Sequence, residues 1–299
     1  MDFMLIDSHC HLHDREFFSE EQAEECLKRA REKNVQKIVC IGTSHEDSLA
    51  AAKFANNHDD VYWTYGIHPE NALGLESAFS SVGLEFSSTS YAGRPGKTAL
   101  KGSFLGAVRN IRVENSNHFY TSEKVDSKPP IAIGEVGLDY HYDDYNRTAQ
   151  IRLFEEMLQL AVDNDLPLSF HVRNAFSDFF PIVENFPTVR GCVHSFTDSK
   201  KTLKRILENT DFYVGVNGLA TYSTLPTPPL ERILLETDAP FLTPVPFRGM
   251  INEPRYIFNI AEWLSQKLGV EFEIIEKVTT ENAERLFRFP SSRTTERAE

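Results

Sequence analysis

The feature that most constrains the fold is a regular alternation of short apolar runs with segments whose apolar residues recur at helical spacing. The run from Val35 to Ile41 reads VQKIVCI, which is typical of a strand buried on both faces. Eight strands separated mostly by helices imply a parallel sheet. A closed eight-strand barrel needs about 250 residues, so the 299 residues of this chain favour an α/β fold, a (β/α)8 TIM barrel. The other predicted strands lie at 4–7, 61–67, 131–135, 167–172, 189–194, 212–216 and 233–237.

Helical period is clearest from Ile151 to Ala161, where apolar residues share one face. A helix is also predicted to open at Ser19, because Gln22 follows at the spacing of a capping box. Further helices fit residues 198–209 and 253–267. An open doubly wound sheet is the alternative fold, but no glycine-rich phosphate loop follows the first strand.

Two stretches break the alternation. Residues 72–130 contain few strong elements and are rich in serine and glycine from 77 to 103, so we expect an atypical loop insertion between the third and fourth strands. Residues 221–229 leave little room for a seventh helix, which we expect to be shortened. Residues 1–289 are otherwise predicted to form a single barrel domain, and the polar tail 290–299 is expected to be frayed.

Composition excludes several classes of protein. No apolar stretch approaches the roughly 20 residues that span a bilayer, and the start lacks the basic region of a signal peptide. We therefore expect a soluble protein with no membrane partner, cytoplasmic or, in a eukaryote, nuclear. The four cysteines form no CxxC pair, as is typical of reduced thiols, and Cys10 and Cys192 are expected to fill the core. No segment predicts an oligomer, so a monomer is expected.

The formal charge of −13 argues against a broad nucleic-acid-binding surface, which normally carries a basic stripe. It does not exclude an enzyme that acts on one strand end, because bound divalent cations would supply positive charge where the phosphate lies.

Histidines and acids fall at the predicted strand ends. His9 and His11 follow the first strand, and because alternate residues of a strand point to the same side, the two can bind one metal ion together. Active sites of barrel enzymes lie at the carboxyl ends of the strands. For any single histidine a hydrogen-bonded core position is the plainer interpretation, but the set favours a site. Its other members are His68 after the third strand, Glu135 at the end of the fourth, His171 in the fifth, His194 in the sixth and Asp238 after the eighth.

Four imidazoles and two carboxylates could hold two divalent ions with Glu135 as the bridge. Nitrogen and oxygen ligands of this kind suit Zn, Mn, Fe or Co, and they tolerate Mg with added water; we expect Mg²⁺, Zn²⁺ or Mn²⁺. Two ions about 3.5–4 Å apart would lower the pKa of a shared water and stabilise both oxygens of a phosphoester displacement.

The chain resembles the TatD family of metal-dependent deoxyribonucleases, which are amidohydrolase-like barrels. The resemblance implies a two-metal hydrolase of phosphodiester bonds in DNA that acts as a 3′-to-5′ exonuclease. Its substrate would be DNA ends, or RNA ends. No protein partner is evident. Its motifs appear in order as IDSHCHL at 6–12, GIHP at 66–69, IGEVGLDY at 133–140, HVR at 171–173, VHSF at 193–196 and LLETDAP at 234–240, followed by RG at 248–249, NEP at 252–254 and TENA at 280–283.

The resemblance also implies a role for each residue. Glu135 and Asp238 would be the catalytic residues, with Asp238 also able to take a proton from the attacking water. His68 and Arg173 would meet substrate phosphate, Arg173 through its guanidinium fork. One ion would be held by His9, His11 and Asp238, the other by His171 and His194, and Glu135 would touch both.

Neighbouring residues carry weaker expectations. His13 and His141 do not match ligand positions and are expected to be structural or exposed, while Asn252 and Glu253 are expected to order the rim near Arg248. Cations of the inserted segment could guide a polynucleotide toward the metals, although the serine-rich composition favours a solvated loop. These cations are Arg94, Lys97, Lys101, Arg109 and Arg112.

Two other functions stay open. The site could hydrolyse an amide or carboxylic ester, as in the D-aminoacyl-tRNA deacylation associated with TatD-like proteins. Many such enzymes bridge their metals with a modified lysine on the fourth strand, whereas this chain has Glu135, which favours phosphoester chemistry. The altered seventh unit would also suit a catalytically inactive scaffold protein, but the presence of all six predicted ligands speaks against it.

Overall fold

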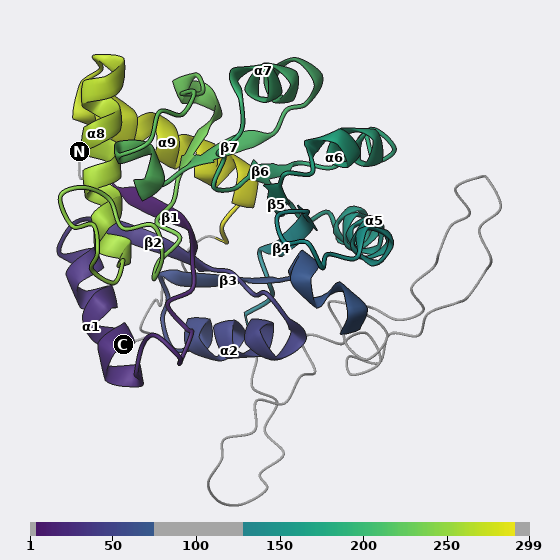
Figure 1. Cartoon of the computed structure of the whole chain (residues 1–299). Helices are drawn as coiled ribbons and strands as arrows, with labels where there is room; N and C mark the ends of the chain where they lie inside the picture. The colour runs from purple at the N-terminus through teal and green to yellow at the C-terminus, as the bar shows by residue number, and fades with distance from the viewer. Residues whose placement is uncertain (1–3, 75–127, 291–299) are drawn as a thin grey trace, which may run out of the picture.

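The computed structural model describes residues 4–74 and 128–290. Eight parallel strands form one sheet in the order in which they follow along the chain, and helices surround it (Figure 1). The predicted barrel is thereby confirmed. The strands are β1 (Leu5–Cys10), β2 (Val35–Cys40), β3 (Val61–Tyr65), β4 (Ala132–Asp139), β5 (Leu168–Arg173), β6 (Gly191–Val193), β7 (Tyr213–Val216) and β8 (Ile233–Leu235).

The first and last strands meet near their carboxyl ends. Asp238 N–H donates to the carbonyl of His9 at 2.8 Å, and His11 N–H donates to the carbonyl of Ala239 at 2.7 Å. The Ser8 hydroxyl also donates to the carbonyl of Leu235 at 2.8 Å. These bonds bring residues from the two ends of the chain to one seam of the barrel.

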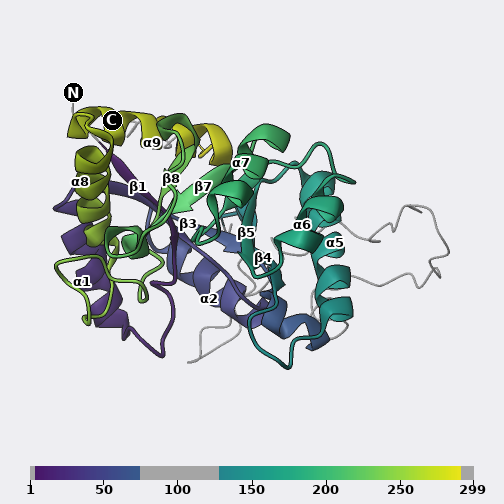
Figure 2. The ribbon, with the colours of Figure 1, turned by 45° about the horizontal axis from the view of Figure 1, so that its top comes forward.

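The described helices lie around the strands (Figures 1 and 2). Ser19 caps α1 through the predicted capping box with Gln22. Within residues 4–74 and 128–290, no helix has the length and apolar character that crossing a bilayer requires. The helices are α1 (Glu20–Arg31), α2 (His45–Asn56), α5 (Arg147–Asn164), α6 (Phe176–Val183), α7 (Lys200–Asn209), α8 (Ile257–Leu268) and α9 (Phe272–Phe287), with the 3-10 turns η1 (Pro69–Gly74), η2 (Gly218–Thr221), η3 (Leu230–Arg232) and η4 (Pro254–Tyr256).

Two apolar clusters hold the layers together. The larger one lies between the strands and the helices and contains Cys10 and Phe154. The smaller one joins strand residues such as Ile6 and Cys192 to Leu286 of α9. Because the Asn282 amide of α9 donates to the carbonyl of Ile233 at 2.9 Å, this helix covers the amino end of the barrel. The carboxyl end stays available for a site.

Several boundaries differ from the sequence predictions. Strand β1, predicted at 4–7, extends to Cys10, so His9 lies inside it rather than after it. Strand β4 continues to Asp139, so Glu135 lies inside it rather than at its end. Helix α7 begins at Lys200, after the cap residue Ser199. The helix predicted from 253 begins as the turn η4, and α8 starts at Ile257. Each difference leaves the strand order unchanged.

The seventh unit is shortened as predicted. Between β7 and β8 the chain forms only the 3-10 turns η2 and η3. Trp263 of α8 reaches this flank and lines a small pocket with Val214 and Val216, so α8 covers part of the sheet there. Most of the predicted insertion, residues 75–127 with its five cations, lies outside the described residues, as does the tail 291–299.

Candidate metal centre

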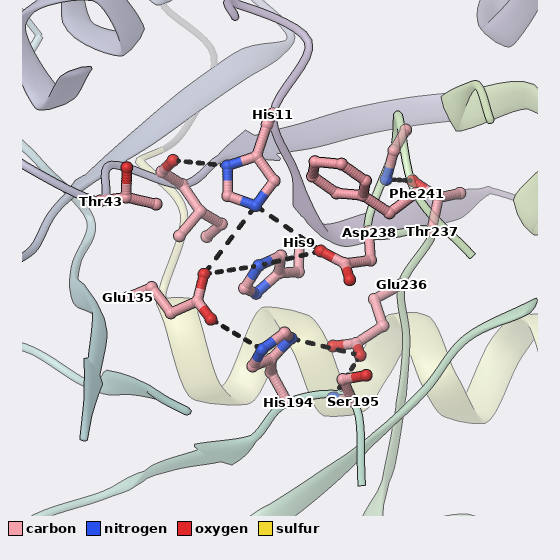
Figure 3. Close-up of polar contacts among 12 residues, drawn as sticks. His9, His11, Thr43, Glu135, His194, Ser195, Glu236, Thr237, Asp238 and Phe241 are labelled. Carbon is pink, nitrogen blue, oxygen red and sulfur yellow. Dashed lines mark hydrogen bonds and ion pairs between the residues drawn. The ribbon is translucent and has the colours of Figure 1, made fainter. Parts of the chain in front are cut away.

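The six predicted ligands come together at the carboxyl end of the barrel, and Figure 3 shows five of them around one small space. Within the described residues, three overlapping groups have ligand atoms close enough to hold an ion: His9 with His11 and Glu135, His9 with His194 and Asp238, and His68 with Glu135 and His171.

One half of the site is spaced as if around an ion. His9 Nε2 lies 3.5 Å from Glu135 Oε2 and 3.5 Å from Asp238 Oδ1. His11 Nε2 lies 3.9 and 3.6 Å from the same two oxygens. Two ligands about 2.1 Å from a tetrahedral ion are about 3.4 Å apart. His9 Nε2 is also buried without a hydrogen-bond partner, which is costly unless a cation binds there. These residues fit a divalent metal.

The other half is closed by hydrogen bonds. Glu135 Oε1 lies 2.6 Å from His171 Nδ1 and 2.9 Å from His194 Nε2. The two oxygens of Glu135 thus face different groups of imidazoles, Oε2 toward His9 and His11 and Oε1 toward His171 and His194. A carboxylate in this position is what bridging of two ions requires.

The buried carboxylates are ionised. Burial would raise the pKa of Glu135, but His194 and His171 beside it hold that pKa well below its usual value. Burial likewise opposes ionisation of Asp238, and the imidazoles of His11 and His9 beside it lower its pKa. Two ionised acids among four imidazoles make a site suited to cations.

Two carboxylates that the sequence reasoning left without a role support the histidines. Asp139 Oδ2 lies 2.9 Å from His171 Nε2. The carboxylate of Glu236 is buried, 3.7 Å from His194 Nδ1, and accepts the Ser195 N–H at 2.6 Å. Such partners fix the orientation of a ligating ring. Both lie in quoted motifs, Asp139 four residues after Glu135 and Glu236 two residues before Asp238, and this spacing on extended chain was the available signal.

The neutral partners of the first two histidines complete this support. His9 Nδ1 lies 3.1 Å from the Ser169 hydroxyl, and His11 Nδ1 lies 3.1 Å from the carbonyl of Ile41. Each ring therefore has one nitrogen held by the protein, which leaves Nε2 directed at Glu135 and Asp238. This division of the two nitrogens is typical of metal-binding histidines.

The predicted substrate residues lie beside this space. His68 Nε2 is 3.7 Å from Glu135 Oε1, and its ring meets that of His171 edge-on at 4.4 Å. Burial lowers the pKa of His68 to about 4, so its imidazole is neutral at pH 7. Arg173 is half-exposed; its guanidinium lies 3.9 Å from Asp139 and over the ring of Tyr142 at 5.5 Å.

The weaker expectations are also placed. His13 is buried and bonds Asp47 at 2.9 Å, whereas His141 is exposed. Asn252 is fully buried and its amide donates to the carbonyls of Thr237 and Phe241 at 2.8 and 2.6 Å, so it orders the segment after β8.

Glu253 and Arg248 make separate contacts. Glu253 pairs with Arg29 at 2.8 Å, which ties the start of η4 to α1. Arg248 is exposed and stacks on the ring of Tyr222 at 4.1 Å. The rim near Arg248 is thus ordered by Asn252 and by this stacking contact.

The sequence matches a known protein family over nearly its whole length. The model of the "TatD related DNase" family matches residues 6–288. The chain belongs to this family. The metal-dependent hydrolase YabD of Bacillus subtilis is 32% identical over 294 residues, which cover 95% of this chain and 99% of the relative. The deoxyribonuclease Tat-D of Schizosaccharomyces pombe is 36% identical over 226 residues, 72% of this chain and 62% of that protein.

Solved structures of TatD-related proteins agree with this fold. The crystal structure of YJJV, a TatD homologue from Escherichia coli, superposes with a TM-score of 0.73 at 26% identity and covers 97% of this chain and 100% of that one. The TatD family model extends from Ile6 in β1 to Arg288 after α9. It therefore includes every strand that carries a candidate ligand.

Proposed function

We propose that this TatD-family chain is a metal-dependent deoxyribonuclease that removes nucleotides from DNA ends in the 3′-to-5′ direction, as a cytoplasmic monomer. The observation that carries the proposal is the position of Glu135 between two groups of imidazoles at the open end of the barrel. The deoxyribonuclease name of the fission-yeast relative supports the choice of DNA. The four cysteines are buried and free, which supports a reducing compartment.

The residues supply distinct parts of the chemistry. Divalent ions at this site would supply Lewis acidity that activates water and stabilises a departing oxygen. Asp238 is ionised and directed into the same space, so its carboxylate can accept the proton of the attacking water. Glu135 would contribute one carboxylate oxygen to each half of the metal centre.

The substrate phosphate is held by groups of two kinds. His68 is neutral and can donate an N–H to a phosphate oxygen at little desolvation cost. Arg173 adds a charged fork at the rim of the site, where bidentate bonding to phosphate is strong. Together they would hold the scissile phosphate over Glu135.

A labelled oligonucleotide tests the proposal. With Mg²⁺, Mn²⁺ or Zn²⁺ in separate reactions, a 5′-labelled single strand should shorten stepwise from its 3′ end, and EDTA should stop the reaction. Glu135→Ala should lower the rate by at least a thousandfold, a loss of about 4 kcal/mol in transition-state stabilisation, with an unchanged circular-dichroism spectrum.

Glu281→Ala, an exposed glutamate of α9 at the other end of the barrel, is the matched control and should retain full activity. Hydrolysis of an aminoacyl ester without cleavage of DNA would contradict the proposal. So would cleavage of DNA by metal-loaded Glu135→Ala protein at the wild-type rate.

A further inference from the structure

An exposed aromatic pair lies beside the candidate metal centre. Phe241 is 45% exposed and Phe17 is 38% exposed, and their rings meet edge-on at 5.2 Å. The Phe241 ring is 6.4 Å from the ring of His11, and Figure 3 shows it next to His11 and Asp238. The exposed ring of Phe241 therefore lies next to a candidate metal ligand, His11.

Two hydrogen bonds fix the backbone of Phe241. Its N–H donates to the carbonyl of Asp238 at 2.8 Å. Its carbonyl accepts the amide of the fully buried Asn252 at 2.6 Å, and the same amide holds the carbonyl of Thr237. Phe17 packs against the ring itself. A braced ring loses little conformational entropy when a ligand covers it.

The chemistry of the site favours a nucleobase as that ligand. Every base has a flat face that stacks on an aromatic ring regardless of sequence. A chain of formal charge −13 gains little from general attraction to phosphates, so an uncharged contact is a suitable source of affinity. A phosphate placed at Glu135 and Arg173 would carry its own nucleoside next to the mouth of the site.

We propose that Phe241, backed by Phe17, stacks on the nucleobase of a nucleotide that flanks the scissile phosphate. The inference rests on the proposed function, because it takes a DNA strand end as the ligand. It adds that the end must be unstacked from its neighbour and unpaired before it fits, so single strands should be preferred over blunt duplexes.

A cycle of protein and base deletions tests the contact directly. The ligand is a fluorescent single-stranded octamer whose last three linkages are phosphorothioates, and Kd is measured by anisotropy with Ca²⁺ present. Phe241→Ala should weaken binding about tenfold. In two further ligands an abasic tetrahydrofuran residue replaces the terminal or the penultimate 3′ nucleotide. One of these two replacements should weaken binding to the wild-type protein about tenfold. The same replacement should leave binding to Phe241→Ala nearly unchanged.

Two further variants separate stacking from general effects. Phe241→Trp should bind at least as well as wild type, whereas Phe241→Leu, apolar but not aromatic, should resemble Phe241→Ala. Ile274→Ala, an exposed apolar residue of α9, should change nothing.

The outcomes distinguish this inference from the proposed function. Equal losses on base removal in wild type and Phe241→Ala would overturn the stacking contact even if wild type digests DNA, and so would the absence of measurable binding to the octamer. If base removal weakens binding to wild type but not to Phe241→Ala, and wild type does not digest an unmodified strand, the stacking contact is supported and the nuclease activity is rejected.

Discussion

At the scale of single residues, the two ring nitrogens of His171 have different partners. Nδ1 faces Glu135 at 2.6 Å and Nε2 faces Asp139 at 2.9 Å. Strand β4 approaches closely here: a Cβ on Gly137, whose φ is +148°, would lie 2.0 Å from the carbonyl oxygen of His171. We therefore expect Asp139 to be a positioning residue that holds the ring of His171 while β4 and β5 keep this register.

Asp139→Ala should lower the affinity of the centre for Zn²⁺ or Mn²⁺ by about ten- to a hundredfold, because the ring of His171 loses its orientation and its basicity. Competition with a chelating dye measures the affinity. Asp139→Asn should recover part of the loss. The control is Asp178→Asn, which removes a surface partner of Arg147; a loss of the same size there would contradict the assigned role.

At the scale of elements, an ion pair between the buried His13 and the partly exposed Asp47 joins the loop after β1 to helix α2. His13 Nε2 lies 2.9 Å from Asp47 Oδ1, and the Thr43 N–H donates to Asp47 Oδ2 at 2.8 Å. Burial would lower the pKa of His13, but the bond to Asp47 with the nearby Cys40 raises it to about 9. Burial would raise the pKa of Asp47, but His13 and Thr43 lower it to about 2.

The pH dependence of this pair follows from the two shifts. The histidine contribution is complete below pH 6.5 and is lost as the pH rises through 9, while the aspartate contribution is complete above pH 3.8 and is lost as the pH falls through 2. Asp47→Asn should therefore lower the free energy of unfolding by roughly 2–3 kcal/mol at pH 5.5 and by less than half of that at pH 9.5, as measured by urea denaturation.

Asp60→Asn provides the comparison for that experiment, because Asp60 pairs with an arginine, Arg31, at 2.7 Å. Its effect on stability should be the same at pH 5.5 and pH 9.5. A loss for Asp47→Asn that is equally large at both pH values would show that the charge of His13 does not matter.

The strands and helices could be predicted from the sequence because the spacing of apolar residues in each segment indicates which of its faces is buried. Strand order and the shortened seventh unit followed from the alternation and from the proline-rich residues 221–229. The spacing of Asp139 and Glu236 indicated that both point toward the site. It did not indicate their partners, because strand periodicity gives the side to which a residue points but not which histidine of a neighbouring strand it meets. The end of β4 was also missed, since a polar Glu135 inside a strand looks like its terminus.

At the scale of the whole molecule, the centre joins distant parts of the chain. Its candidate ligands come from residues 9 to 238, and the backbone bond from Asp238 N–H to the carbonyl of His9 lies beside them. Cations bound there would link β1, β4, β5 and the segments after β6 and β8, and they would bind the folded state but not the unfolded chain. Metal occupancy and global stability should be coupled.

Saturation with metal at a hundred times its Kd should stabilise the fold by about 2.7 kcal/mol and raise the Tm by about 5 °C. Differential scanning calorimetry with and without EDTA measures the shift. In Glu135→Ala most of the increment should disappear. An identical Tm for chelated and metal-loaded wild-type protein would contradict the coupling.

The seam between β1 and β8 has a consequence during synthesis. Domains tend to fold from the amino end as the ribosome extends the chain, yet a nascent chain that stops before residue 238 has neither the bonds that join the two edges nor the last acid of the centre. The complete set of candidate ligands is therefore present only in roughly the last fifth of translation. A polypeptide that is interrupted or clipped before this residue would therefore lack a complete metal centre.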